Sequence, residues 1–285
     1  MSSHYPVDLI RSGDLPADVV KQIRWAKETL ERQGWADRLT ELIGSPITLT
    51  MKMLPSVASD ALNAAIDKSL RAALSVAIQT LGTESSGGET KRPRLTIHKI
   101  LAGLSGAAGG AFGLSTVALE LPVSTLLILR SIADIARSEG EDMTDLRSRL
   151  ACLEVFAIDG GNQSGIKDGT EVGYFAVRAT MSKQVADASK YIVQHGISDS
   201  SAPPLVRFLA GIASRFGVVV NEKIAAQAIP IIGAVGGALI NTYFIDHYQE
   251  LARAHFTIRR LERQYGESLI RSEYVRLGDA SHGAE

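Results

Sequence analysis

Residues 103–130, GLSGAAGGAFGLSTVALELPVSTLLILR, form a glycine-rich apolar stretch in which Glu120 is the only charge before Arg130. Residues 224–245, IAAQAIPIIGAVGGALINTYFI, have the same character and carry no charge. Glycines four residues apart share one face of a helix and let a second backbone approach closely. The two stretches therefore predict closely packed helices, either at the centre of a helical core or in a membrane.

The composition favours helices over sheets. Of the 285 residues, 45% are hydrophobic and only 6% are aromatic, and apart from the valines at 218–220 no segment alternates with a period of two. We therefore expect an all-α fold, a multi-helix bundle built around the two glycine-rich segments. The formal net charge is −1, which gives no field that attracts nucleic acid, so no nucleic-acid partner is expected.

Residues 83–94, TESSGGETKRPR, read as the clearest linker because they are small, polar and glycine-containing. This linker divides an N-terminal helical region, residues 1–82, from a helical core, residues 95–277. Residues 278–285 are expected to form a disordered tail.

Capping residues and prolines predict where several helices begin: near Asp14, at Ser56, at Thr144 and at Pro203. The last of these helices is expected to end at Gly217. Pro122 is expected to kink or restart its helix, because proline cannot donate the backbone hydrogen bond that a helix interior requires.

Glu120 is the most unusual residue of the first apolar stretch. A carboxylate among apolar side chains must be paired, protonated or open to water. The simplest interpretation is an ion pair, with Arg215 or Lys223 as candidates, or hydrogen bonds to backbone groups freed by Pro122. The alternative is a polar site in the middle of the core that binds a metal, a proton or a ligand headgroup.

Other charged residues were considered for the same polar site. Arg130 and Asp134 are four residues apart, a spacing that predicts an ion pair along one helix, with Arg137 close by. The alternative is a network that includes Glu154 or Glu222 at the edge of the core.

Two histidines, His247 and His255, lie eight residues apart with Glu250 between them. They could ligate a metal, but the spacing is not that of a zinc protease, and a polar helix face explains them as well. The run at 259–266, RRLERQYG, reads as a solvated helix face. Cys152 is the single cysteine and is interpreted as a core residue. We expect neither a cofactor nor a catalytic residue.

The chain resembles the EcsC family over roughly residues 95–265. The segments that carry the resemblance are ELPVSTLLILRSIADIAR (120–137), CLEVFAIDGG (152–161), GYFAVR (173–178), RFGVVVNEKIAAQAIPIIGAVGGALIN (215–241) and HYQELARAHFTIRRLERQYG (247–266). The family takes its name from a bacterial operon that also encodes an ABC transporter. The resemblance therefore implies an accessory protein, cytoplasmic or peripheral at the inner membrane face, and it supplies no catalytic residue.

Two functions remain open from the sequence. The first is a non-enzymatic helical protein that supports transport or secretion machinery, with a membrane surface or a membrane transport protein as its partner. The second is a helical enzyme or a ligand- or metal-binding protein with a central polar site around Glu120. The N-terminus has no secretory signal, so a cytoplasmic location, with membrane association possible, is the expectation.

Overall fold

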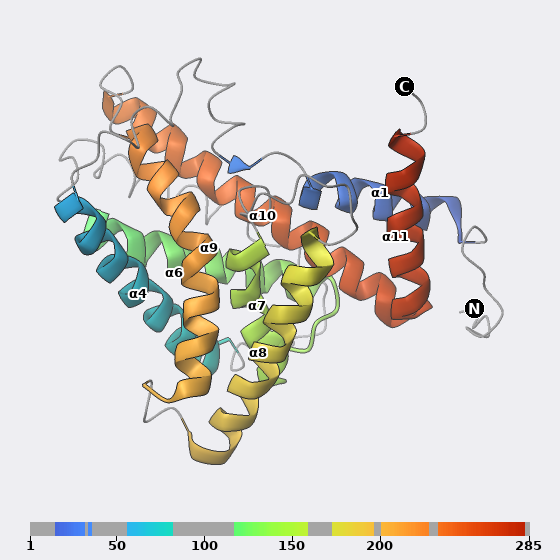
Figure 1. Ribbon diagram of the computed structural model, residues 1–285, viewed down its shortest axis with the longest axis horizontal. Coiled ribbons are helices and arrows are strands. Elements are labelled where there is room, and N and C mark those ends of the chain that lie inside the picture. The colour runs from blue at the N-terminus through green and yellow to red at the C-terminus, as the bar shows by residue number, and fades with distance from the viewer. Residues whose placement is uncertain are drawn as a thin grey trace.

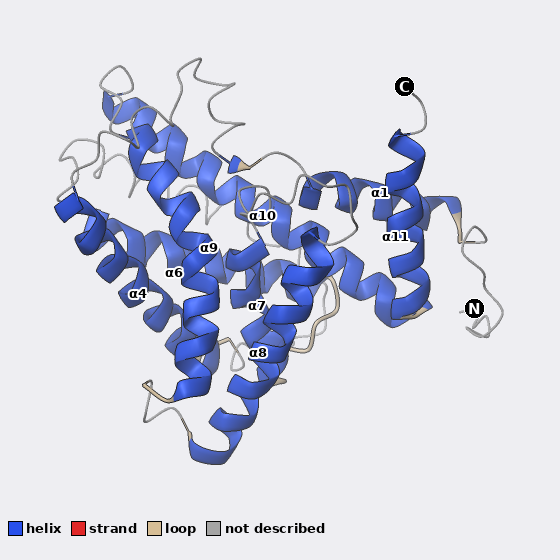
Figure 2. Ribbon diagram, viewed as in Figure 1, coloured by secondary structure: helices blue, strands red, loops and turns tan. Residues whose placement is uncertain are grey.

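The computed structural model describes residues 15–31, 34–35, 56–81, 117–158, 173–196, 201–227 and 233–282 (Figure 1). Within these residues every element is a helix and none is a strand, so the all-α prediction is confirmed (Figure 2). The helices are α1 (Ala17–Glu31), α4 (Ser56–Gln79), α6 (Val117–Ser138), α7 (Leu146–Ile158), α8 (Gly173–His195), α9 (Pro203–Gln227), α10 (Gly233–Tyr265) and α11 (Glu267–His282).

Helix α7 lies at the centre of the bundle. It is short, yet residues 150–158 are all buried, so no face of its second half meets water. A helix that is apolar on all sides has to be surrounded by others. α7 accordingly packs against α4, α6, α8, α9 and α10. The core beside it is aromatic: Phe156 contacts Phe216 with ring centroids 4.9 Å apart, and Phe244 lies 5.2 Å from Tyr248.

Helix α10 is the longest helix and connects the two ends of the molecule. Towards its C-terminal end it packs against α1 and α11, which also contact each other (Figure 1). It also packs against α6 and α9, and α4 lies against both of these helices. Most of the charged contacts described below reach α10, because it touches nearly every other part of the bundle.

Apolar residues spaced three or four positions apart form the core-facing sides of three helices, as this spacing predicts. In α1 the side chains of Val19, Ile23 and Ala26 are buried, and Leu30 is half-buried against the core. In α4 Leu62, Ile66, Leu70 and Leu74 are buried and Ile78 is half-buried, and in α8 the stripe of Val177, Met181, Val185, Ala188 and Ile192 is buried. α8 ends at a glycine, Gly196, with a positive φ of 73°, a conformation that favours glycine at a helix C-terminus.

The predicted helix end at Gly217 is wrong. α9 continues through Gly217 to Gln227, and its second half is almost entirely buried. A Cβ atom at Gly217 would meet only the Ile66 side chain, at 3.6 Å, so this glycine neither breaks the helix nor is required there. The apolar residues after it stay helical because they face the core. As a result, the second glycine-rich stretch is divided between the end of α9 and the start of α10.

Pro122 does not restart a helix, so this part of the prediction is wrong. α6 begins at Val117 and runs without a break to Ser138, with Pro122 inside it. Nearby, the hydroxyls of Ser124 and Thr125 both donate to the carbonyl of Leu121, at 3.1 and 2.7 Å. The earlier part of the first glycine-rich stretch, residues 103–116, lies outside the described residues, as does the linker at 83–94.

Two helix ends differ from the sequence-based expectation. The backbone N–H of Arg147 donates to the side chain of Asp145 at 3.2 Å, so Asp145 caps α7 and the prediction of Thr144 is wrong. Thr144 instead donates from its backbone and its hydroxyl to Asp142 in the preceding turn. At the other end of the chain, α11 extends to His282, so residues 278–282 of the expected tail are helical.

One helix of the described part of the chain, α9, is long and apolar enough to cross a membrane by length and composition alone. Core helices of soluble proteins also meet this criterion, but they are mostly buried. Only 44% of the most apolar part of α9 is buried.

Candidate functional site

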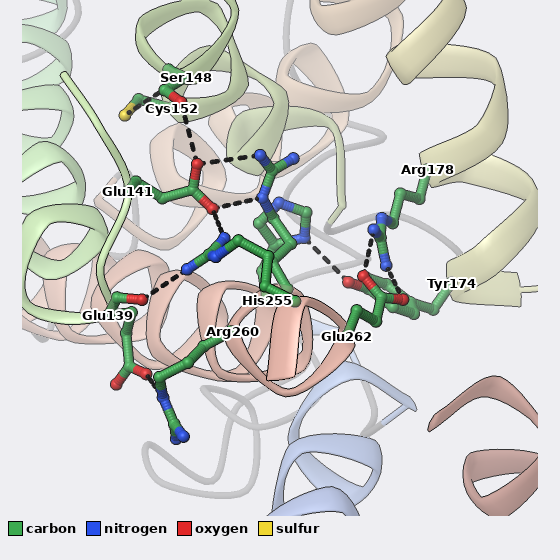
Figure 3. A network of polar contacts seen from close by, with 11 residues as sticks. Glu139, Glu141, Ser148, Cys152, Tyr174, Arg178, His255, Arg260 and Glu262 are labelled. Atoms are coloured by element: carbon green, nitrogen blue, oxygen red, sulfur yellow. Dashed lines mark hydrogen bonds and ion pairs between the residues drawn. The ribbon is translucent and has the colours of Figure 1, made fainter. Parts of the chain in front are cut away.

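A cluster of charged side chains lies between the α6–α7 turn and α10, with Glu141 at its centre (Figure 3). The side chain of Glu141 is only 3% exposed. It accepts hydrogen bonds from Arg259 Nε at 2.8 Å, from a second Arg259 nitrogen at 3.0 Å, and from Arg263. The Ser148 hydroxyl donates a further bond, at 3.0 Å. These donors satisfy both carboxylate oxygens, which a buried carboxylate requires.

The charge state of Glu141 follows from these partners. Burial by itself raises the pKa of the carboxyl group, but the hydrogen bonds and charges of Arg259 and Arg263 outweigh burial and hold the pKa below its usual value. Glu141 is therefore an anion at neutral pH. The chain reaches it through Gly140, whose φ of 82° favours glycine and turns the backbone after α6.

The same cluster connects α1 to α10. Arg260 donates to the Glu139 carboxylate at 2.7 Å and to the Gln22 side chain at 2.6 Å. Arg263 also donates to the Glu139 backbone carbonyl at 2.7 Å. Arginine can make all these contacts because its guanidinium carries five donors in one plane.

Helix α8 is joined to α10 by a second set of polar contacts, also drawn in Figure 3. Arg178 binds both oxygens of Glu262, at 2.7 and 2.5 Å, and the Glu262 side chain is 8% exposed. One turn before Arg178, the Tyr174 hydroxyl lies 2.9 Å from Nδ1 of His255. Burial, together with the charges of Arg259 and Arg178, lowers the pKa of His255, so its imidazole is neutral.

Two buried groups in this region have polar atoms without a hydrogen-bond partner among the described residues. They are Oε1 of Glu154 and Nε2 of His255. Burial raises the pKa of Glu154 to about 7, although the charges of Arg259 and Arg178 oppose the increase. A carboxyl group that titrates near neutral pH can hold or release a proton under ordinary conditions.

Glu120 belongs to a different part of the core. Its carboxylate accepts a hydrogen bond from Lys223 of α9 at 3.0 Å, and the two side chains are 7% and 3% exposed. The Lys223 ammonium group also lies 4.8 Å from the centre of the Phe244 ring. The predicted ion pair with Lys223 is therefore confirmed. Burial lowers the pKa of Lys223, and the charge of Glu120 opposes this effect.

The other residues that the sequence suggested for a polar site differ in their surroundings. Arg130 is exposed, and Asp134 binds Arg137 at 2.8 Å, an i,i+3 contact, while Arg137 also donates to the Leu81 carbonyl. Glu222 and His247 are each 4% exposed. Within the described residues no group of three or more His, Cys, Asp and Glu side chains could hold a metal ion.

Two sequence-based interpretations of α10 are wrong, the first only in part. The 259–266 run is solvated only in part: Arg263 and Gln264 are exposed, whereas Arg259 and Glu262 form the part-buried contacts described above. His247 and His255 are buried, so they do not lie on a solvent-exposed polar face. The signal was present in the sequence: buried Ala254, Phe256 and Ile258 are spaced by two residues, which puts apolar groups on more than one side of the helix.

Glu141, Tyr174 and Arg178 were not singled out from the sequence. Their partners lie 118, 81 and 84 residues away along the chain, so no local spacing marks them. Glu141 lies in a polar turn, where a carboxylate is ordinarily exposed. Only the fold places it beside two arginines of α10.

The model of the EcsC protein family matches residues 17–261, from the start of α1 to near the end of α10. The similarity thus begins well before residue 95. No curated protein and no solved structure matches the chain.

Proposed function

Because the chain belongs to the EcsC protein family, we propose that it is a non-enzymatic accessory protein at the cytoplasmic face of a membrane. In this role it supports membrane transport or secretion machinery. The observation that carries the proposal is the uneven burial of α9, the apolar helix whose two halves have different surroundings.

The second half of α9 is held in the bundle. Residues 216–226 are buried except Val218 and Asn221, which are half-buried, and Lys223 pairs with Glu120 of α6. The first half has a different environment, since Val206, Arg207 and Ala210 are exposed. This half is the part of an apolar helix that remains available to a membrane or a partner.

The length of the available half supports peripheral attachment over spanning. Residues 203–215 extend about 20 Å at the rise of an α-helix, whereas the hydrocarbon core of a bilayer is about 30 Å thick. Withdrawing the second half would separate Lys223 from Glu120 and leave two buried charges unpaired, which is costly. We therefore propose that α9 contacts a membrane without crossing it.

The interior of the bundle supports a structural role. Glu141 is paired with Arg259 and Arg263, and the charges of Arg178 and Glu262 neutralise each other. Burial raises the pKa of the Cys152 thiol to about 12, so the thiol is not a nucleophile at neutral pH. These groups hold helices together in the way a binding scaffold needs.

A second candidate function is the binding of a small polar ligand or a proton in the bundle. The observation that favours it is the pair of unsatisfied buried atoms, Glu154 Oε1 and His255 Nε2. Such a site would lie where α7 packs against α8 and α10, and not at Glu120, whose charge Lys223 already neutralises. A high-resolution crystal structure tests it: a bound molecule within hydrogen-bonding distance of either atom supports the candidate, and its absence contradicts it.

Fractionation of cells that express the full chain tests the main proposal. We expect the protein to sediment with membranes and to be released by a wash with alkaline carbonate, as peripheral proteins are. The proposal would be contradicted if all of the protein were found in the soluble fraction and none in the membrane fraction. A chain that resists the wash would show that α9 or another segment spans the membrane.

A further inference from the structure

Helices α8 and α9 pack side by side and converge at one end of the molecule, at the bottom of Figure 1. We call the described residues at this place, 190–196 and 201–207, the α8–α9 end. The two helices approach closely above it: a Cβ atom on Gly211 would lie 2.4 Å from the Gln184 side-chain oxygen. The α8–α9 end therefore projects from the molecule, and the packing of α8 against α9 holds it in place.

The α8–α9 end presents aliphatic side chains to solvent. Val193 is 75% exposed and Val206 is 39% exposed, and Pro203 beside them is also exposed. Val193 is the most exposed large hydrophobic residue in the described part of the chain. A single exposed valine is ordinary, but here each of the two helices carries an exposed valine near the same end of the molecule.

Positive charges lie on both helices, two of them close to the exposed valines and two further along. Lys183 and Lys190 lie on α8, and Arg207 and Arg215 lie on α9. None of these four cations forms an ion pair with a residue that the structure describes; Arg207 donates only to the Pro203 carbonyl, at 3.3 Å. The nearby acidic residues are Asp187 on α8 and Asp199 in the sequence that connects the helices.

The positions of these groups match the layers of a membrane surface. Lys190 precedes Val193 by three residues, about 4.5 Å along a helix, and Arg207 directly follows Val206. Aliphatic groups at the end can enter the boundary between headgroups and acyl chains, while the cations behind them meet lipid phosphates. The whole chain has a net charge of −1, so the excess of cations is a local feature of α8 and α9.

We propose that the α8–α9 end docks onto a membrane surface that contains anionic lipid, with Val193 and Val206 inserted and Lys190 and Arg207 against the headgroups. This inference rests on the proposed function and names the surface and the ligand class that would carry it out. Attachment depends on charge as well as on apolar contact, so it weakens as salt concentration increases.

Sedimentation of the purified full chain with lipid vesicles tests the proposal. The probes are vesicles of phosphatidylcholine alone and vesicles that also contain phosphatidylglycerol. We expect binding to the anionic vesicles and little to the neutral ones. Lys190→Gln with Arg207→Gln should weaken binding roughly 30-fold, as two headgroup contacts imply. Val193→Ser with Val206→Ser should weaken it at least about tenfold.

Matched control variants remove similar groups elsewhere. Lys21→Gln with Arg24→Gln takes two exposed cations from α1, and Val123→Ser with Leu239→Ser takes two exposed aliphatic groups from α6 and α10. All these changes are on the surface, so the melting temperature should remain close to that of the wild type. We expect the controls to bind vesicles as the wild type does.

Several results would overturn the proposal. Equal binding to neutral and anionic vesicles contradicts the headgroup contacts, and an equal loss in the control variants contradicts the location. A wild-type chain that binds no vesicle, yet fractionates with membranes in cells, overturns this inference and leaves the proposed function standing, with a membrane protein as the attachment point. A chain that does neither contradicts both.

Discussion

Glu141 and Arg259 lie 118 residues apart in the chain and are joined by two hydrogen bonds, of 2.8 and 3.0 Å. The contact joins the turn after α6 to α10, and Arg263 and Ser148 complete it. The carboxylate is 3% exposed, whereas Arg259 retains 23% exposure. A fork of two parallel bonds to a buried carboxylate fixes the orientation of both side chains. It therefore sets how α10 lies against the centre of the bundle.

Glu141→Gln should destabilise the protein by about 3 kcal/mol, because it leaves the guanidinium groups of Arg259 and Arg263 without their anion. Urea denaturation followed by circular dichroism measures the free energy of unfolding. Glu139→Gln is the matched control. The Glu139 side chain is 21% exposed, so this substitution should lower the free energy of unfolding by about 1 kcal/mol or less. If both variants lost the same free energy of unfolding, burial of the Glu141 contacts would make no additional contribution to stability.

The pair of Glu120 and Lys223 should behave as a coupled unit. Lys223→Met leaves a buried carboxylate unpaired and should cost about 3–5 kcal/mol, whereas Glu120→Gln in addition should recover much of that loss. The measurement is a double-mutant cycle of unfolding free energies. Additive losses in the double variant would mean that the 3.0 Å contact does not couple the two residues.

Glu154 should make stability fall as pH rises. Its pKa in the folded protein is about 7, above the ordinary 4.5, so the folded state binds the proton more tightly. Its favourable contribution is complete below pH 4.5 and is lost as pH rises to about 7. Relative to the wild type, Glu154→Gln should therefore gain up to about 3 kcal/mol of stability across that range, as a shift of this size implies.

Unfolding measurements at several pH values test this prediction. His255 titrates in the opposite sense: its pKa is lowered on folding, so its contribution is lost as pH falls. It is present in both proteins, so its effect largely cancels in the difference between them. A difference that does not change with pH would show that the carboxyl group of Glu154 is not buried in the way the structure places it.

The Cys152 thiol should be unreactive in the folded protein. It is fully buried, its Sγ lies 3.5 Å from the Ser148 carbonyl oxygen, and burial raises its pKa to about 12. Reaction with a disulfide reagent at neutral pH should therefore wait for unfolding, when the single thiol becomes available. Absorbance of the released chromophore, with and without denaturant, gives the rates. Fast labelling without denaturant would contradict the burial of α7.

The helical faces could be predicted from the sequence because they depend on spacing within one segment. The stripes of α4 and α8 are examples, since each repeats every three or four residues and faces the core, with Ile78 at the end of the α4 stripe half-buried. The extent of α9 could not be predicted. Gly217 suggests a helix end locally, but packing of the following residues against the core overrides the cost of one glycine.

The candidate site was harder to predict for a related reason. Glu120 stands out because it is a charge among apolar residues, and Lys223 could be named as its partner. Glu141 lies among other polar residues, so only its distant partners, Arg259 and Arg263, reveal its burial. These partners lie 118 and 122 positions from Glu141, and no local spacing or unusual surroundings mark the contact in the sequence.

A fluorescent probe at the α8–α9 end gives the most direct test of membrane attachment. A polarity-sensitive dye can be placed on Val193→Cys, because the native Cys152 is buried and its pKa of about 12 keeps it unreactive. The same dye on Lys21→Cys of α1 serves as the control. When vesicles containing phosphatidylglycerol are added, emission from position 193 should shift to the blue and emission from position 21 should not. An unchanged spectrum at position 193, while the chain sediments with the vesicles, would contradict the account.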